Sequence, residues 1–391
     1  MAMQACKLGE NKHVYSQKIA RNRKPTKNPF PLSPLDTSLL PAGLGDATHC
    51  RDFLRLSKVI PLEMTSQSTL SFPSAVRFLQ GTFYILDPSW GLVLTFDENG
   101  AFQGVLGHKG EGPGEYQNPE TVEVIWQDHL AVADLGSLLV YDAGGTFVKK
   151  VTIRTDGWAF DFNSHFIWET EDRLAIGSFN TVNPENPKHV ILKHENNRFT
   201  PYYGFGERHP EEARFERFNI PVFDYSCFGL IGGNYWVGSP YSATLEIYDA
   251  EARFLGTLKR AYAEQLVPSD FSDIKSMDDT RGLYVQVRNF INLQVDGLVL
   301  SYLTGNRVMH VNVYDTHGNL LHHDLPNFHS ILWPLTSHGR KLVCLIPILG
   351  SEAEYRQHLN EDEMASLRAA GFDVDNLDDM NPALAIFELK E

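Results

Sequence analysis

The sequence predicts an all-β chain in which six sheets of about four strands stand around one axis, a six-bladed β-propeller. Three observations predict this fold class. A hairpin motif recurs along the chain, its copies begin at the spacing of one propeller blade, and both chain ends contain a strand that can complete the same sheet. A pair of packed sheets, a β-sandwich, is the alternative.

The hairpin motif is clearest in two consecutive units. In the first, an apolar strand ends at Asp87 and a second strand ends at Asp97, followed by a turn that contains Gly100. In the second unit the corresponding strands end at Asp134 and Asp142, and the turn contains Gly145, which is 45 residues after the first glycine. Glycine adopts the positive φ angle that tight hairpin turns need, so each unit is predicted to form a β-hairpin.

Four weaker copies follow, with their hairpin strands near residues 192, 248, 314 and 387. The fourth turn, 250–252, has no glycine, whereas the fifth contains Gly318. The spacing widens from 45 to 66 and 73 residues in the later units, which predicts insertions there. Repeats of about 40–50 residues with four strands each are typical of propeller blades, so the count of copies predicts six blades.

The ring is predicted to close through its two ends. The last strand, Ala383–Leu389, has no hairpin partner after it, and the strand-like segment Phe53–Leu62 precedes the first complete unit. We therefore expect this N-terminal strand to complete the sixth blade, which removes an exposed sheet edge. Residues 351–371 are rich in helix formers and predict one or two short helices inserted before the outer strand of that blade, as a lid, a partner contact or a solvated decoration.

Several segments together resemble a known group of proteins. In order along the chain they are Val59–Glu63, Phe96–Gly100, the stretch GEGPGEY at Gly110–Tyr116, and Asn381–Lys390. The set resembles the six-bladed β-propeller proteins abundant in Bacteroidetes, of NHL-like or TolB-like architecture, over about residues 50–391. The resemblance implies a propeller and an exported, uncharacterised lipoprotein, but it implies no activity, so no catalytic residue is carried over.

The N-terminal region and the overall charge bear on location. Cys6 follows a small residue, Ala5, and precedes a polar stretch, as at the processed start of a bacterial lipoprotein. We expect residues 1–49 to be a signal remnant, flexible tether and lead-in, and residues 50–391 to be the propeller. The 34 basic and 49 acidic residues give a net charge of −15, which argues against nucleic-acid partners and leaves a lipid on Cys6 as the predicted membrane contact, in the periplasm or at the outer membrane.

Two glycine-rich stretches, Gly107–Pro119 and Gly204–Glu212, are candidate binding loops. They are expected to connect an outer strand to the next innermost strand, and such connections gather on one loop-rich face around the central channel. The polar side chains of these two loops are the candidate ligand-binding residues His108, Lys109, Glu111, Glu115, Tyr116, Glu207, Arg208 and His209. The alternative is that the glycines solve a steric problem at the blade junctions and that the charged groups face solvent.

Other residue types give little indication of chemistry. The sequence has no nucleophile elbow and no cysteine–histidine pattern of zinc type. Asp87 and Asp134 could hold calcium or act as acid and base, but their regular recurrence favours hydrogen bonds to backbone N–H groups. Tryptophans could offer platforms to sugar rings or could pack between blades: Trp158, Trp168, Trp236 and Trp333.

These observations favour an exported binding propeller that recognises a protein or carbohydrate partner on its loop-rich face. One alternative is a calcium-assisted hydrolase or lyase that acts on sugar-derived substrates, and calcium is then the expected cofactor. The other alternative is a structural subunit of an outer-membrane assembly, docked through the helical insertion. No catalytic residue and no metal ligand is predicted, so the sequence leaves enzymatic activity open.

Overall fold

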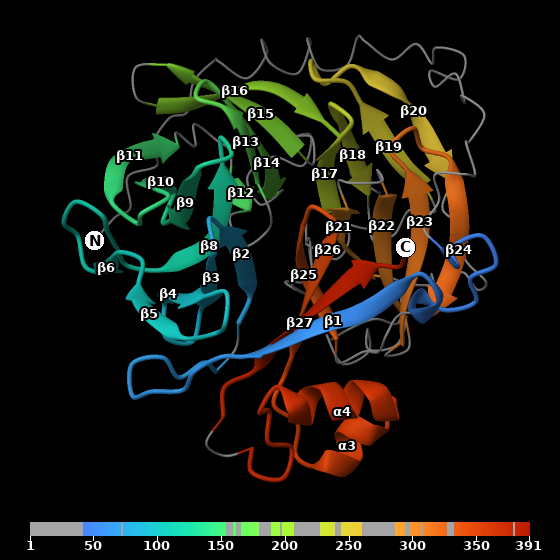
Figure 1. Cartoon of the computed structure of the whole chain (residues 1–391). Coiled ribbons are helices and arrows are strands. Elements are labelled where there is room, and N and C mark those ends of the chain that lie inside the picture. The colour runs from blue at the N-terminus through green and yellow to red at the C-terminus, as the bar shows by residue number, and fades with distance from the viewer. Residues whose placement is uncertain are drawn as a thin grey trace, which may run out of the picture.

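The computed structural model describes the chain from residue 42 onward, with internal gaps. The described residues are 42–71, 73–153, 159–161, 166–179, 189–195, 198–206, 227–238, 244–259, 286–293, 298–305, 308–326, 332–377 and 380–391. In this part of the chain the strands form six blades, and Figure 1 shows them arranged as a ring. The predicted all-β propeller is therefore confirmed.

Each blade runs from an inner to an outer strand, paired antiparallel with its neighbour. Blade 1 comprises β2 (Ala75–Leu79), β3 (Thr82–Asp87), β4 (Leu92–Asp97) and β5 (Phe102–Val105). Blade 2 comprises β8 (Pro119–Ile125), β9 (His129–Asp134), β10 (Ser137–Asp142) and β11 (Phe147–Ile153). Blade 3 comprises β12 (Ala159–Asp161), β13 (Ile167–Thr170), β14 (Arg173–Phe179), β15 (His189–Glu195) and β16 (Arg198–Phe205), with β12 and β13 both paired to β14.

The remaining blades complete the ring. Blade 4 comprises β17 (Cys227–Ile231), β18 (Asn234–Gly238), β19 (Thr244–Tyr248) and β20 (Phe254–Lys259). Blade 5 comprises β21 (Gln286–Leu293), β22 (Leu298–Gly305), β23 (Val308–Asp315) and β24 (Leu320–Pro326). Blade 6 comprises β25 (Trp333–His338), β26 (Lys341–Ile346), β27 (Ala383–Leu389) and, as its outer strand, β1 (Leu54–Pro61).

The two ends of the chain meet in blade 6, as predicted. Strands β1 and β27 lie side by side in Figure 1 and pair antiparallel from Leu54↔Leu389 to Pro61↔Ala383. A β-bulge at Ser57 interrupts this register between Leu56 and Lys58. This pairing covers the edge of β27, with β1 as the outer strand of the blade, and it closes the ring.

The recurring aspartates build the predicted hairpin turns. Asp97, at the end of β4, accepts hydrogen bonds from the N–H groups of Asn99 (2.8 Å) and Ala101 (2.9 Å), and Gly100 has φ +87°. Equivalent bonds form at Asp142, Asp249 and Asp315. The turn without glycine keeps the same shape, because Ala252 adopts φ +57° at the glycine position. The backbone caps therefore fix the turn even where the favoured residue is missing.

Aromatic side chains pack between neighbouring blades. Trp236 of blade 4 is fully buried and meets Tyr314 of blade 5 edge-on, with ring centroids 5.9 Å apart. Trp168 of blade 3 is 3% exposed and contacts the Trp126 ring of blade 2 at 4.8 Å. For these two of the four tryptophans, packing between blades is thus the observed role; Trp158 and the side chain of Trp333 lie outside the described residues.

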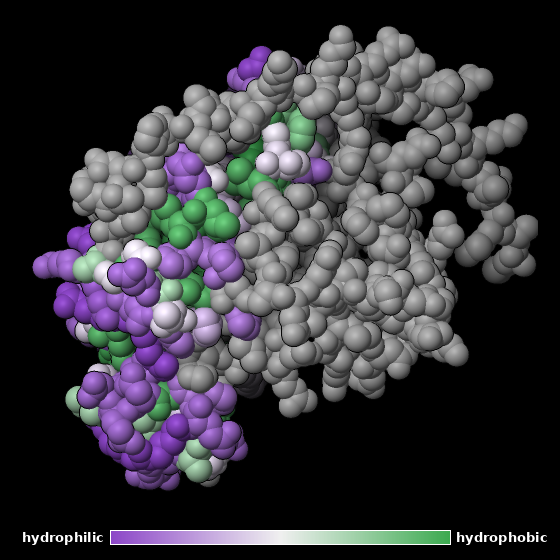
Figure 2. All heavy atoms as spheres, turned by 90° about the vertical axis from the view of Figure 1, so that its right-hand side faces the viewer, coloured by the Kyte–Doolittle hydropathy of each residue, from purple (hydrophilic) through white to green (hydrophobic). Residues whose placement is uncertain are grey.

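The helical insertion is present, and its apolar side is part of the core. Helices α3 (Glu352–Arg356) and α4 (Glu361–Ala369) lie between β26 and β27, one strand earlier than expected, because β1 rather than β27 is the outer strand. Tyr355, Met364 and Leu367 are fully buried against residues of blade 6. Figure 2 shows that the outward surface of this helical lobe, at the bottom of the view, is mainly hydrophilic.

The insertion is also tied to the segment before β1. The short 3-10 helix η2 (Cys50–Asp52) carries Arg51, which donates from Nε and Nη2 to the Glu363 carboxylate at 2.8 and 2.7 Å. Glu363 is 6% exposed and also accepts the backbone N–H of Asn360, which caps α4. A bidentate pair between an arginine and a largely buried carboxylate fixes the orientation of the two side chains as well as their distance. The insertion is therefore docked on the segment before β1 and is not a freely solvated decoration.

Candidate functional site

The loop-rich face consists of two kinds of connection. One joins the outer strand of a blade to the inner strand of the next, and the other joins the second and third strands within a blade. Within the described residues this face comprises the connections 62–74, 88–91, 106–118, 135–136 and 347–382. The opposite face, called here the hairpin-turn face, carries the turns after the inner strands, such as 80–81, 126–128 and 339–340. The candidate loop 106–118 enters β8 and lies on the loop-rich face, as predicted.

Buried tyrosines hold this loop from below. Tyr116 has no exposed surface; its hydroxyl donates to the Leu106 carbonyl (2.8 Å) and accepts from the Val93 N–H (3.1 Å). Burial raises the pKa of Tyr116 to about 12. Tyr141 of blade 2 donates to the carbonyl of Gly114 at 3.0 Å. Tyr116 thus supports the loop and presents no surface to a ligand.

Glu115 folds back onto its own loop. Its Oε2 accepts the N–H of Gly112 at 2.8 Å. A Cβ atom on Gly110, which has φ +159°, would lie only 2.0 Å from that same oxygen. The glycine is therefore needed to let the carboxylate close the loop, and the alternative interpretation of the glycines as a steric solution accounts for this part of the motif.

Three of the candidate side chains remain at the surface. His108 and Lys109 form the two-residue strand β6 (His108–Lys109), which pairs with β7 (Glu115–Tyr116), and both are exposed. The exposed Glu111 accepts a hydrogen bond from the side chain of Gln117 at 2.6 Å. The Lys109 side chain lies beside Gly91 of the neighbouring connection 88–91. A Cβ atom on Gly91 would lie 3.3 Å from Lys109 Nζ. These exposed groups sit on a rigid support, which is the arrangement that recognition requires.

Asp87 and Asp134 are structural. Asp87 is fully buried and accepts N–H groups from Ser71 (2.5 Å) and Ser89 (2.9 Å). Asp134 is 4% exposed and accepts the N–H groups of Gln117 (3.0 Å) and Asn118 (2.6 Å). Both aspartates therefore hold the connection that enters their own blade, as their recurrence indicated.

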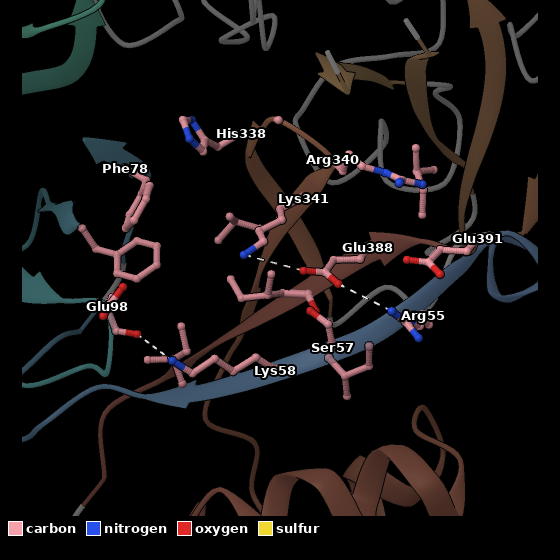
Figure 3. A pocket seen from close by; sticks show the side chains of 17 residues that line it. Arg55, Ser57, Lys58, Phe78, Glu98, His338, Arg340, Lys341, Glu388 and Glu391 are labelled. Atoms are coloured by element: carbon pink, nitrogen blue, oxygen red, sulfur yellow. Dashed lines mark hydrogen bonds and ion pairs between the residues drawn. The ribbon is translucent and has the colours of Figure 1, made fainter. Parts of the chain in front are cut away.

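The hairpin-turn face carries a groove that the sequence did not suggest. It has a volume of about 1110 Å³ and lies at the seam between blade 6 and blade 1. Figure 3 shows polar and charged side chains around it, from β1 (Arg55, Lys58), from the β25–β26 hairpin (His338, Arg340, Lys341) and from β27 (Glu388). The lining comes from segments more than 300 residues apart, so only the closure of the ring brings these residues together.

A family model described as a six-bladed β-propeller, DUF5128, matches residues 44–329. The chain belongs to this family. The DUF5128 assignment agrees with the six blades and with the predicted resemblance to a propeller family. The matched region begins at Leu44, a fully buried residue before β1.

Solved structures show the same fold. A Bacteroides fragilis protein inferred to be exported is similar to this DUF5128 chain with a TM-score of 0.60 and 14% identity, over 88% of this chain and 97% of that one. A member of the DUF4221 family from Bacteroides vulgatus has a TM-score of 0.57 and 10% identity, over 87% and 99%. None of the curated proteins compared with the chain matches it. At these identities the similarity concerns the fold alone.

Four predicted residues lie outside the described part of the chain. They are Glu207, Arg208 and His209 of the second candidate loop, and Cys6. Among the residues that the structure describes, no group of three or more His, Cys, Asp or Glu side chains is placed to hold a metal ion. The same residues contain no helix long and apolar enough to cross a membrane.

Proposed function

We propose that this DUF5128 propeller is an exported binding protein that recognises a protein partner on its loop-rich face. The observation that carries the proposal is the distribution of exposed apolar side chains. Of the seven large hydrophobic side chains exposed in the described residues, four lie on connections of the loop-rich face: Met64, Trp90, Leu135 and Ile348. The other three lie on outer strands: Val148, Tyr202 and Leu320.

Trp90 and Leu135 support this proposal most strongly. They occupy the corresponding turns of blades 1 and 2, between second and third strands, and are 49% and 57% exposed. Exposed tryptophan on a rigid turn is typical of the anchors that dominate protein interfaces. Loop 106–118 enters blade 2 from blade 1 and adds the charged groups of Lys109 and Glu111, which suit the polar rim of such an interface.

Export is proposed on two grounds. A similar propeller from Bacteroides fragilis is inferred to be exported. Cys6, with the small residue before it and the polar stretch after it, matches the processed start of a lipoprotein. We place the protein in the periplasm or at the outer-membrane surface, held by a lipid on Cys6, and we relate it to lipoproteins with NHL-like propellers. Replacing Cys6 with serine should move the protein from the membrane fraction to the soluble fraction.

The recognition surface is tested by site-specific photo-crosslinking. A photoreactive phenylalanine analogue placed at Trp90 should give one defined adduct with another envelope protein in living cells. The same analogue at Gln127, an exposed residue on the hairpin-turn face, is the matched control and should give none. Equal labelling from both positions, or none from Trp90, would overturn the assignment of the surface.

A further inference from the structure

The groove at the seam of blades 6 and 1 is large enough for a small-molecule site. Its volume of about 1110 Å³ lies slightly above the roughly 300–1,000 Å³ usual for ligand pockets. It lies on the hairpin-turn face, away from the surface proposed above for a protein partner. Its walls come from β1, the β2–β3 hairpin, the turn after β4, the β25–β26 hairpin, and β27 with the residues that follow it.

Basic side chains line this groove although the protein is strongly acidic. The whole chain has a net charge of −15. The lining contains four basic and three acidic side chains: Arg55, Lys58, Arg340 and Lys341 against Glu98, Glu388 and Glu391. Basic groups at this density on an acidic protein offer an anionic ligand several cationic partners.

Two of these cations share one carboxylate loosely. Glu388 lies 3.9 Å from Arg55 Nη2 and 3.6 Å from Lys341 Nζ, on either side of it in Figure 3. Charge-assisted hydrogen bonds are normally about 2.7–2.9 Å long, so neither cation makes a close bond to this carboxylate. Arg55 and Lys341 are also more than half exposed. Both can therefore turn to an incoming carboxylate oxygen without breaking a close hydrogen bond to Glu388.

The cation on the other side of the groove is held differently. Lys58 Nζ donates to the carbonyl oxygen of Glu98 at 2.8 Å and to the side-chain oxygen of Asn99 at 3.3 Å. The bulge at Ser57 sets this part of β1, and the Ser57 hydroxyl donates to the Ile386 carbonyl at 3.0 Å. Bulges of this kind redirect side chains beside binding sites. Lys58 thus fixes the blade 1 wall, whereas Arg55 and Lys341 are the pair suited to bind an anion.

An aromatic wall faces these charges. Phe78 and Phe83 pack with ring centroids 4.7 Å apart, and His338 meets Phe78 edge-on at 5.6 Å. Such a wall suits the apolar face of a ring. The carboxylates of Glu98 and Glu391 can accept hydrogen bonds from hydroxyl groups, whereas they would repel a bare inorganic anion.

We propose that this groove binds an acidic sugar, a hexuronate whose carboxylate is bound by Arg55 and Lys341 after these side chains turn from Glu388, and whose ring faces Phe78. A hexuronate is one class of small molecule that combines the three features that the lining complements: a single negative charge, a ring with an apolar face, and several hydroxyl donors. The site is independent of the loop-rich face.

The test is isothermal titration calorimetry with sodium glucuronate on the full chain. Glucose supplies the ring and hydroxyls without the charge, and acetate supplies the charge without the ring. We expect glucuronate to bind at least about tenfold more tightly than either, because each control lacks one charge-assisted or stacking contact. Glucose binding as tightly as glucuronate, or no glucuronate binding at millimolar concentration, would overturn the proposal.

Substitutions locate the site. Lys341→Gln and Arg55→Gln should each weaken glucuronate binding about tenfold, the loss expected for one charge-assisted contact. The exposed Lys150→Gln on outer strand β11 is the matched control and should change nothing. Thermal unfolding checks that each variant is folded. Unchanged affinity in both folded groove variants would refute the assignment, and this result would leave the photo-crosslinking test of the loop-rich face unaffected.

Discussion

The Asn381 side chain joins the segment before β27 to the connection that follows β1, and its replacement by leucine should destabilise the propeller. It lies just before β27 and is 1% exposed. Its Oδ1 accepts the N–H of Leu70 at 2.8 Å, and its Nδ2 donates to the carbonyls of Glu63 (2.9 Å) and Ser68 (2.6 Å). One amide therefore holds the connection from β1 to β2 at three points.

The size of the effect follows from the groups that lose a partner. Leucine has a similar volume but no polar atoms, so the Leu70 N–H and the Ser68 carbonyl each lose this bond. The Glu63 carbonyl keeps the hydroxyl of Ser68 as donor at 2.8 Å. A buried group left unpaired costs about 1–3 kcal/mol, so two groups predict a loss of about 2–6 kcal/mol in the free energy of unfolding.

Urea unfolding followed by tryptophan fluorescence measures this loss. The exposed Asn118→Leu is the matched control and should change stability by no more than about 0.5 kcal/mol. Asn381→Asp should be less stable at neutral pH than at about pH 4, because an ionised carboxylate would face two carbonyl oxygens and protonation restores a donor. If Asn381→Leu were no less stable than the control, the reasoning from these three bonds would be refuted.

Three further predictions concern turns and charge. Gly100→Ala should cost at least about 2 kcal/mol more than Gly145→Ala in urea unfolding, because both have positive φ but a Cβ on Gly100 alone would lie 2.1 Å from a backbone oxygen, that of Pro61; equal losses would contradict this. Ala252→Gly should raise the melting temperature slightly. It relieves about 1–2 kcal/mol of strain from the left-handed backbone conformation, which exceeds the about 0.8 kcal/mol that burial of the Ala252 methyl group contributes. A lower melting temperature would contradict this prediction. Burial, and then the Asp134 carboxylate, raise the pKa of Glu120, so the protein loses stability as pH rises and the folded-state Glu120 ionises. Glu120→Gln should therefore gain stability relative to the native chain between about pH 4 and pH 7. A stability difference that does not change with pH would contradict this prediction.

The fold could be predicted well because the repeated motif contains the residues that each hairpin turn needs locally. Aspartate followed by a positive-φ glycine is a local turn signal, and both Gly100 and Gly145 form the predicted turns. The unpaired last strand indicated that β1 would close the ring. The burial of the helical insertion could not be predicted, because the partner of Glu363 is Arg51, 312 residues earlier in the chain.

The candidate site was predictable only in part. Polar residue type suggested Glu115 and Tyr116 as binding groups, but the structure uses one to close the loop and buries the other. The groove was missed because its residues come together only across the seam. One signal was available: Arg55 and Lys58 are charged residues on a strand already predicted to complete blade 6.

Cysteine cross-linking across the seam tests the central claim, that the two chain ends form one blade, most directly. Arg55 and Glu388 are opposite one another in the β1–β27 register. Opposed residues in an antiparallel pair lie about 4.5–5.5 Å apart between Cα atoms, within the range of a disulfide. We expect Arg55→Cys with Glu388→Cys to form a disulfide, found by mass spectrometry of the linked peptides. Lys58→Cys with Glu388→Cys, displaced by two residues in the register, should form none. Linkage in the displaced pair and none in the opposed pair would contradict the closed ring as described.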